Sequence, residues 1–135
     1  MDKIWLKSYP SGVPFDIDPG QYRSLVHLLE EAFSQHAQRP FSVCMDRWMS
    51  YAELDKLSAQ MGAWLQGLGL EPGARVAIML PNVPQFAVSM AGVLRAGFTC
   101  VNVNPLYTAR ELEHQLADSG AEVIVVVENL SLIHI

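Results

Sequence analysis

The 135-residue sequence is poor in charge, holds only two cysteines and has no long uninterrupted apolar run. Charged residues make up 17% of the chain and apolar residues 50%, which excludes a disordered or solvating segment. Cys44 and Cys100 are too few and too far apart for a disulfide framework or a zinc site. Arg95 and Gly97 interrupt the longest apolar stretch, residues 86–103, so we expect no membrane-spanning helix.

Basic residues are also scarce. Nine Lys and Arg against fourteen Asp and Glu give a formal charge of −5, which disfavours a nucleic-acid-binding protein. Residues 1–5 lack the basic and then apolar order of a secretory signal peptide. We therefore expect a cytoplasmic protein without a nucleic-acid partner, and the length allows one domain of ordinary size.

The first part of the chain predicts a lead-in, a helix and a hairpin. Residues 1–20 are rich in proline and glycine without a hydrophobic period, which indicates an extended lead-in. From Ser24 onwards apolar residues recur at helical spacing until Pro40 ends the pattern. Alternation over residues 41–45, with a turn at residues 46–47, predicts a small hairpin.

A second helix begins directly after the hairpin. Ser50 and Glu53 have the spacing of a capping box, in which each side chain satisfies a free amide at the helix start. Gly67 is placed to end this helix. We expect Trp64, on its apolar stripe, and Trp48, in the hairpin, to lie in the core.

The second half of the chain has the sequence pattern of a parallel sheet. Residues 76–80 and 123–127 are continuous apolar runs, typical of strands buried on both faces, and residues 99–103 predict a third, shorter strand between them. A very apolar helix over residues 84–96 connects residues 76–80 to residues 99–103. A second helix starts at a capping box of Thr108 and Glu111 and ends at Gly120. The order β-α-β-α-β predicts an α/β fold with an open doubly wound sheet.

Few residues are able to carry chemistry. Gly67 and Gly69 are not followed by the third glycine of a dinucleotide-binding loop, and no other phosphate-loop motif occurs. Asn82, Asn104 and Tyr107 follow two of the predicted strands, where open α/β sheets bind ligands. They could hydrogen-bond a ligand, but asparagine also forms turns, and we favour that structural interpretation.

The acidic surroundings of one histidine raise the question of a metal site. His114 lies beside Glu111, Glu113 and Asp118 on the last predicted helix. We favour a solvated polar face there over a metal site. Four further titratable residues have no partners at ligand spacing: Asp16, Asp18, His27 and His36. The residues alone therefore predict no catalytic group, no cofactor-binding group and no metal ligand.

Four stretches resemble a known enzyme family: SYAEL at residues 50–54, GLEPGARVAIMLPN at 69–82, VNVNPLYT at 101–108 and RELEHQLADSGA at 110–121. They are similar to motifs of the adenylate-forming synthetases. The last two look specifically like those of bacterial long-chain fatty-acid–CoA ligases. Ala109 is a departure, since these ligases often carry proline there, and a good helix former costs little at that position.

The resemblance implies a ligase that uses ATP, Mg²⁺ and coenzyme A on a long-chain fatty acid. The fatty acid and ATP give an acyl-adenylate and pyrophosphate, and the coenzyme A thiol then displaces AMP. In this family the phosphate loop, the adenine-stacking aromatic residue and the mobile C-terminal domain come later in the chain. No catalytic, cofactor-binding or metal-binding residue is therefore carried over, and we expect this chain alone to be inactive.

The resemblance also implies an architecture. Residues 21–129 would be the first part of the large N-terminal domain, a mainly parallel β-α-β-α-β sheet preceded by a helix and a small hairpin. Residues 130–135 (LSLIHI) match one reading frame of a sequencing-library adapter. We therefore expect them to be a non-native tail and the protein to be longer.

An alternative is a small stand-alone α/β module for docking or nucleotide recognition. The bare last strand and the very apolar helix over residues 84–96 disfavour it, because an independent module would cover both. The resemblance implies peripheral contact with the inner face of the membrane and leaves a homodimer open. No basic amphipathic helix in the sequence supports the membrane contact.

Overall fold

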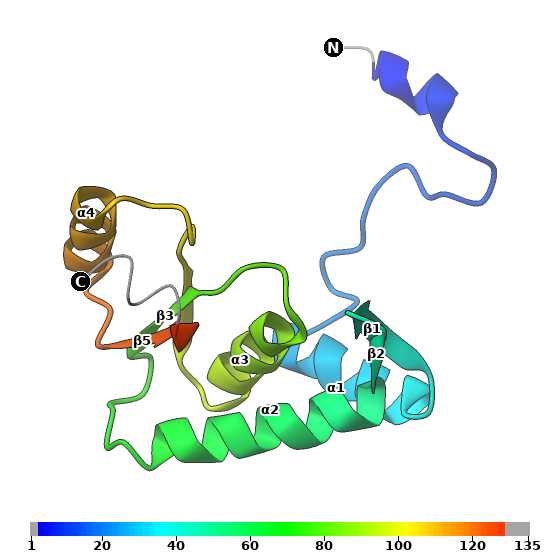
Figure 1. Cartoon of the computed structure of the whole chain (residues 1–135). Helices are drawn as coiled ribbons and strands as arrows, with labels where there is room; N and C mark the ends of the chain where they lie inside the picture. The colour runs from blue at the N-terminus through cyan, green and yellow to red at the C-terminus, as the bar shows by residue number, and fades with distance from the viewer. Residues whose placement is uncertain (1–2, 129–135) are drawn as a thin grey trace.

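The computed structural model describes residues 3–128 and has an α/β architecture (Figure 1). Its elements in chain order are the 3-10 helix η1 (Ile4–Ser8), α1 (Leu25–His36), β1 (Pro40–Cys44), β2 (Arg47–Ser50), α2 (Tyr51–Gln66), β3 (Arg75–Met79), α3 (Pro84–Arg95), β4 (Thr99–Asn102), α4 (Ala109–Ser119) and β5 (Val123–Val126). β1 and β2 form an antiparallel hairpin, and the other strands form a parallel sheet in the order β4-β3-β5. The predicted fold class is confirmed.

β3 is the central strand of the parallel sheet. Val76 pairs with Cys100 of β4 on one side and with Val123 of β5 on the other. Val76, Ala77 and Ile78 are fully buried. A strand covered on both edges and both faces can carry an uninterrupted apolar run, which is why the sequence pattern located it correctly.

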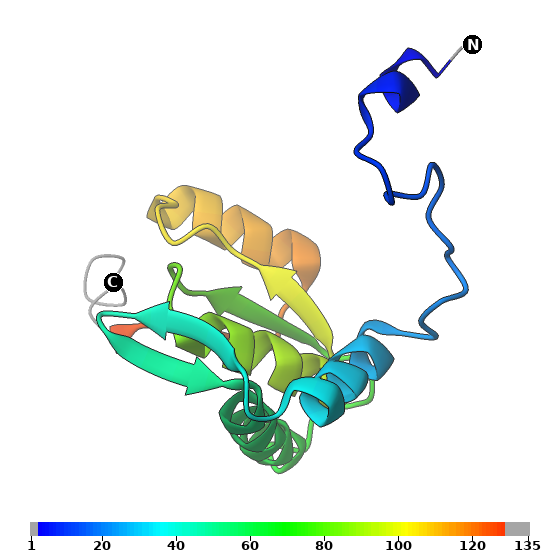
Figure 2. The ribbon, with the colours of Figure 1, turned by 90° about the vertical axis from the view of Figure 1, so that its right-hand side faces the viewer.

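Helices cover the two faces of this sheet (Figure 2). α4 lies on one face, where Leu112 and Leu116 pack against Ala77 and Met79 of β3. α3 lies on the other face, and α2 packs across the outside of α3. The larger apolar cluster fills the space between them, with these buried members: Leu65, Ala74, Val76, Ile78, Leu80, Val93 and Phe98.

Both predicted capping boxes are present. The N–H of Glu53 donates to Ser50 Oγ at 3.1 Å, and the N–H of Ser50 donates to Glu53 Oε2 at 2.8 Å. Thr108 and Glu111 form the same reciprocal pair at the start of α4. These bonds satisfy amides that the first helical turn leaves free, so each helix begins where the sequence predicts.

α2 and α3 approach each other closely at small residues. A Cβ atom placed on Gly92 of α3 would lie 2.7 Å from Met61 Cγ and 3.1 Å from the Ser58 carbonyl oxygen of α2. A Cβ atom on Gly62 would lie 3.1 Å from the Gly92 carbonyl oxygen. The two helices therefore approach closely because neither glycine places a side chain at the contact.

Arg95 joins three helices at the end of α3. Its Nη1 donates to the Asp55 carbonyl oxygen and to Ser58 Oγ of α2, each at 2.8 Å, and forms an ion pair with Asp55 Oδ1, also at 2.8 Å. Its guanidinium also lies 5.3 Å from the ring centroid of Phe33, the buried residue of α1. A planar guanidinium with several N–H donors can make all of these contacts at once, whereas the ammonium group of a lysine would make only some of them.

Three local expectations were wrong. The hairpin turns at Met45 and Asp46, both with positive φ, because β1 and β2 pair Cys44 with Arg47. Trp48 and Trp64, expected in the core, are 64% and 53% exposed. Leu54 and Leu65 of the same apolar stripe on α2 are fully buried, so the stripe is covered only in part and Trp64 belongs to its exposed part. The lead-in, expected to be extended, also contains the short helix η1.

Two further expectations concern the ends of the chain and the membrane. The predicted non-native tail, residues 130–135, lies outside the described residues. Within residues 3–128 no helix is both long and apolar enough to cross a membrane.

Candidate functional site

The carboxyl ends of the parallel strands meet at one edge of the sheet. β3 is followed there by residues 80–83 and β4 by residues 103–108, before α3 and α4 begin. Ligands of open α/β sheets bind at this edge. We therefore expect a ligand site, if the chain forms part of one, at this edge of the sheet.

The structure uses two of the three candidate residues at this edge for folding. The amide oxygen of Asn104 accepts the N–H of Leu106 at 3.0 Å, which closes a side-chain turn. Tyr107 packs into the apolar cluster beneath α4. Both residues therefore have a structural role in the described part of the chain. Asn82 is exposed and lies beside the hairpin, with Val83 and Pro84.

A groove that the sequence did not predict lies between the hairpin and the start of α3. Its volume is about 600 Å³. The lining residues come from three elements and their junctions: Cys44, Met45, Arg47, Trp48 and Met49 from the hairpin, Glu53 and Leu57 from α2, and Val83, Pro84 and Gln85 from the start of α3. No periodicity within one element could have revealed it, because these segments are far apart in the sequence.

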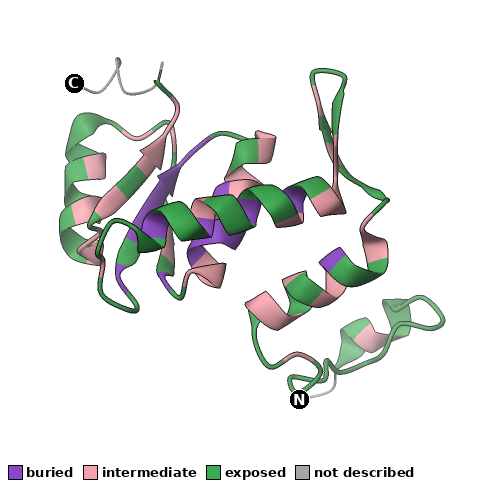
Figure 3. Ribbon diagram, turned by 90° about the horizontal axis from the view of Figure 1, so that it is seen from below, coloured by how far each residue is buried: buried purple, intermediate pink, exposed green. Residues whose placement is uncertain are grey.

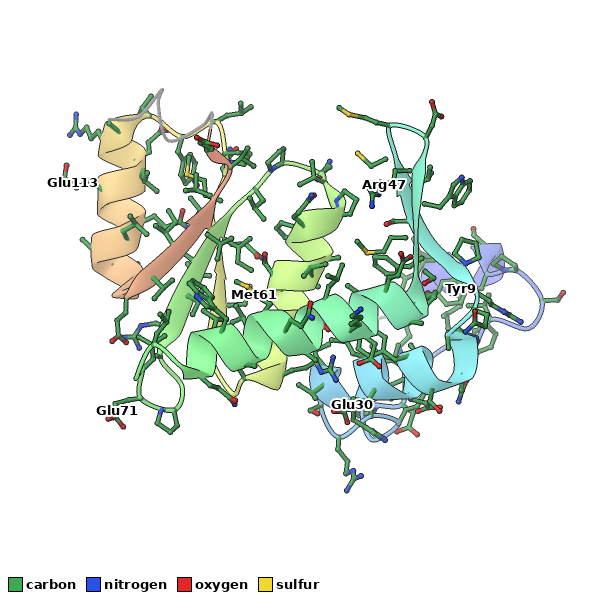
Figure 4. The ribbon with its side chains drawn as sticks, turned by 60° about the horizontal axis from the view of Figure 1, so that its bottom comes forward. Tyr9, Glu30, Arg47, Met61, Glu71 and Glu113 are labelled. Atoms are coloured by element: carbon green, nitrogen blue, oxygen red, sulfur yellow. The ribbon has the colours of Figure 1, made fainter. Side chains whose placement is uncertain are left out.

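The groove is mainly apolar, with one charge of each sign. Arg47 stands on the hairpin, on the side that faces α3 (Figure 4). The hydrogen bonds from the Ser50 backbone and side chain lower the pKa of Glu53, and Arg47 lowers it further. The Glu53 carboxylate is therefore held ionised in its capping box, which makes it a poor general base.

The remaining candidates do not assemble into a catalytic group. Among the described residues no three His, Cys, Asp or Glu side chains gather as a metal site would require. His114 is exposed on α4, as the solvated-face interpretation requires. Burial raises the pKa of the Cys100 thiol, which donates to Asn102 Oδ1 at 3.4 Å. A thiol in that state is a weak nucleophile.

The other titratable residues have local structural partners. Asp16 pairs with Lys3 at 3.0 Å, and Asp18 accepts the N–H of Gly20 at 2.8 Å. The ring of His27 lies against Tyr22, and that of His36 against Tyr51. The first three contacts lie within the lead-in or at the start of α1, and the fourth joins α1 to α2, so none of them points to a shared site.

Comparison with known proteins assigns the fold to a family. The AMP-binding enzyme family matches residues 29–134. A long-chain-fatty-acid–CoA ligase of Yersinia pestis is 51% identical over 132 residues, which are 97% of this chain and 24% of that protein. The chain thus spans about a quarter of the length of the curated relatives that it matches.

Solved structures agree with this assignment. An anthranilate CoA ligase in complex with anthranoyl-AMP superposes with a TM-score of 0.77 at 26% identity, over 83% of this chain and 22% of that one. The N-terminal subdomain of Klebsiella oxytoca NpsA superposes with a TM-score of 0.73 at 24% identity, over 77% of this chain and 27% of that one. The second likeness shows the fold alone.

Proposed function

Because the chain belongs to the AMP-binding enzyme family, we propose that it forms the N-terminal scaffold of a long-chain-fatty-acid–CoA ligase. The observation that carries this proposal is the 51% identity to the Yersinia pestis ligase over nearly the whole chain. The complete ligase would convert a long-chain fatty acid, ATP and coenzyme A into acyl-CoA, AMP and pyrophosphate through an acyl-adenylate.

The residues of this chain do not fit the cofactors of that reaction. The loops after β3 and β4 carry Asn82 and Asn104 but no acidic pair that would hold Mg²⁺. Neither loop has the glycines that bring backbone amides to phosphates. We therefore assign ATP, Mg²⁺ and coenzyme A to the part of the ligase outside the matched residues, and we derive no chemical step from this chain.

The role of this chain is then to hold the sheet edge in place. β3 is fixed by β4, β5 and two layers of helices, so the loops at its carboxyl end start from a rigid base. The proposed cell location is the cytoplasm, with contact at the membrane surface where long-chain fatty acids partition.

A chimera tests the proposal. Residues 1–129 of this chain replace the matching segment of the Yersinia pestis ligase, and acyl-CoA formation is measured with ATP and fatty acids of several chain lengths. We expect activity within about tenfold of the parent ligase, since only scaffold is exchanged. A folded chimera that forms neither acyl-adenylate nor acyl-CoA would contradict the proposal.

The isolated chain is the matched control. We expect it to form no acyl-CoA under the same conditions, because neither loop at the sheet edge has residues that fit the nucleotide or the metal. ATP-dependent acyl-CoA formation by the purified 135-residue chain would show that catalytic groups lie within this chain.

A further inference from the structure

The lead-in presents large apolar side chains that no other part of the described chain covers. Leu6 is half-buried, and every other residue from 3 to 20 is exposed (Figure 3). The exposed fractions are 74% for Ile4, 51% for Trp5, 61% for Phe15 and 89% for Ile17. Apolar side chains gathered on one exposed segment mark an interaction surface.

Two contacts fold the lead-in back on itself. The Lys3 ammonium lies 3.0 Å from the Asp16 carboxylate, and the ring centroids of Tyr9 and Phe15 are 6.1 Å apart. In the described part of the chain, each hydrogen bond, ion pair and ring contact of residues 3–20 has its partner within residues 3–21. The lead-in is therefore a closed loop that stands away from the packed body (Figures 1 and 2).

Several backbone amides of this loop need no outside partner. The N–H groups of Leu6, Tyr9 and Val13 donate to carbonyl oxygens three residues earlier, at 3.1 to 3.2 Å. Three prolines, at positions 10, 14 and 19, carry no N–H at all. Burial of a polar group is costly only where its hydrogen bond is lost, so this loop can approach an apolar layer without forming a long helix.

The charges of the loop cancel. Lys3 is paired with Asp16, and Lys7 and Asp18 are the other charged residues between positions 3 and 20. The chain as a whole has a formal charge of −5, so the rest of it is acidic. An acidic body is repelled by anionic lipid, and a neutral loop gains nothing from it. Electrostatics therefore favours an apolar contact over a charged one.

The aromatic residues of the loop suit the boundary between lipid headgroups and acyl chains. Trp and Tyr have an apolar ring with a polar tip, and they collect at that boundary in membrane proteins. We propose that the lead-in is a membrane contact, in which Trp5, Phe15 and Ile17 insert into the interface of a phospholipid bilayer without a need for anionic lipid. The inference rests on the proposed function, whose long-chain fatty acid partitions into the same layer.

Vesicle flotation tests this contact on the 135-residue chain. One set of vesicles consists of phosphatidylcholine, and a second contains phosphatidylcholine and phosphatidylglycerol in equal parts. We expect binding to both sets, no stronger to the anionic one, because the loop is neutral and the body acidic. Binding that requires phosphatidylglycerol, or that added salt abolishes, would overturn the proposal.

Two pairs of substitutions locate the contact. Trp5→Ser with Phe15→Ser should lower the partition coefficient by about tenfold, since both inserted aromatic side chains are lost. Trp64→Ser with Leu68→Ser is the matched control, because these residues at the end of α2 are 53% and 44% exposed. The control pair should leave the partition coefficient nearly unchanged, and circular dichroism checks the fold of both. Equal losses in the two pairs would show a general affinity of exposed apolar residues and overturn the membrane contact.

The chimera with the Yersinia pestis ligase repeats the test in a complete enzyme. Vesicle binding is compared with and without the pair Trp5→Ser, Phe15→Ser, and we expect the pair to weaken it there as well. An active chimera whose binding ignores the pair would mean that another part of the ligase covers the lead-in; this overturns the contact and leaves the ligase scaffold intact. A folded but inactive chimera that binds vesicles through the lead-in supports the contact and rejects the ligase function.

Discussion

Two glutamates couple the folding of this chain to pH. Hydrogen bonds from the backbone and side chain of Ser50 lower the pKa of Glu53 below its ordinary 4.5, and bonds from the side chain and backbone of Thr108 do the same for Glu111. A carboxylate whose pKa is lower in the folded state stabilises the fold above its unfolded pKa. That stability is lost as the pH falls through the folded pKa.

We predict that the double variant Glu53→Gln, Glu111→Gln loses less stability than the parent between about pH 5 and about pH 3. The measurement is the urea midpoint at each pH, followed by circular dichroism. The double variant Glu30→Gln, Glu113→Gln removes the same number of charges from exposed positions of α1 and α4 and serves as the control. Equal acid sensitivity of parent and double variant would contradict the assignment.

Residue roles could be predicted from the sequence only where a role is local. Both capping boxes, the turn of Asn104 and the end of α4 at Gly120 depend on residues within one or two turns of each other. The exposure of Trp48 and Trp64 depends on which segments cover them, and a spacing pattern does not contain that information.

At the scale of elements, the crossing of α2 and α3 depends on glycine. We predict that Gly92→Ala lowers the free energy of unfolding by about 1–3 kcal/mol, because the new methyl group overlaps Met61. Gly62→Ala should cost less, since its Cβ would approach no atom more closely than the Gly92 carbonyl oxygen at 3.1 Å, while the gain of about 1 kcal/mol in helix propensity is the same at both positions. Denaturant unfolding of both variants checks the order, and an equal or reversed order would contradict the crossing geometry.

The sequence predicts the positions of the helices and strands well, and it predicts less well which of them pack against each other. Apolar runs and caps identify β3, β5, α3 and α4 because each is defined by its own residues. The groove between the hairpin and α3 brings together residues 44–49, 53–57 and 83–85. Such a site depends on the path of the whole chain, which periodicity does not specify.

At the scale of the whole molecule, the lead-in is separate from the packed body (Figure 1). Ile4, Phe15 and Ile17 are 74%, 61% and 89% exposed, and Lys3 pairs with Asp16 inside the same segment. We predict that removal of residues 1–20 changes the free energy of unfolding by less than about 0.5 kcal/mol. Thermal unfolding of the shortened chain checks this, and a loss of several degrees would show contacts between lead-in and body.

The position of β3 in the sheet has a consequence for synthesis on the ribosome. Val76 can pair with Cys100 as soon as β4 emerges, but its second partner, Val123, comes only after α4 has been made. Until then the growing chain carries β3, the strand that is most buried in the final fold, with one edge open. Slow translation after residue 103 would prolong that state, so the time during which a holdase chaperone can capture the nascent chain is set by the order of the strands.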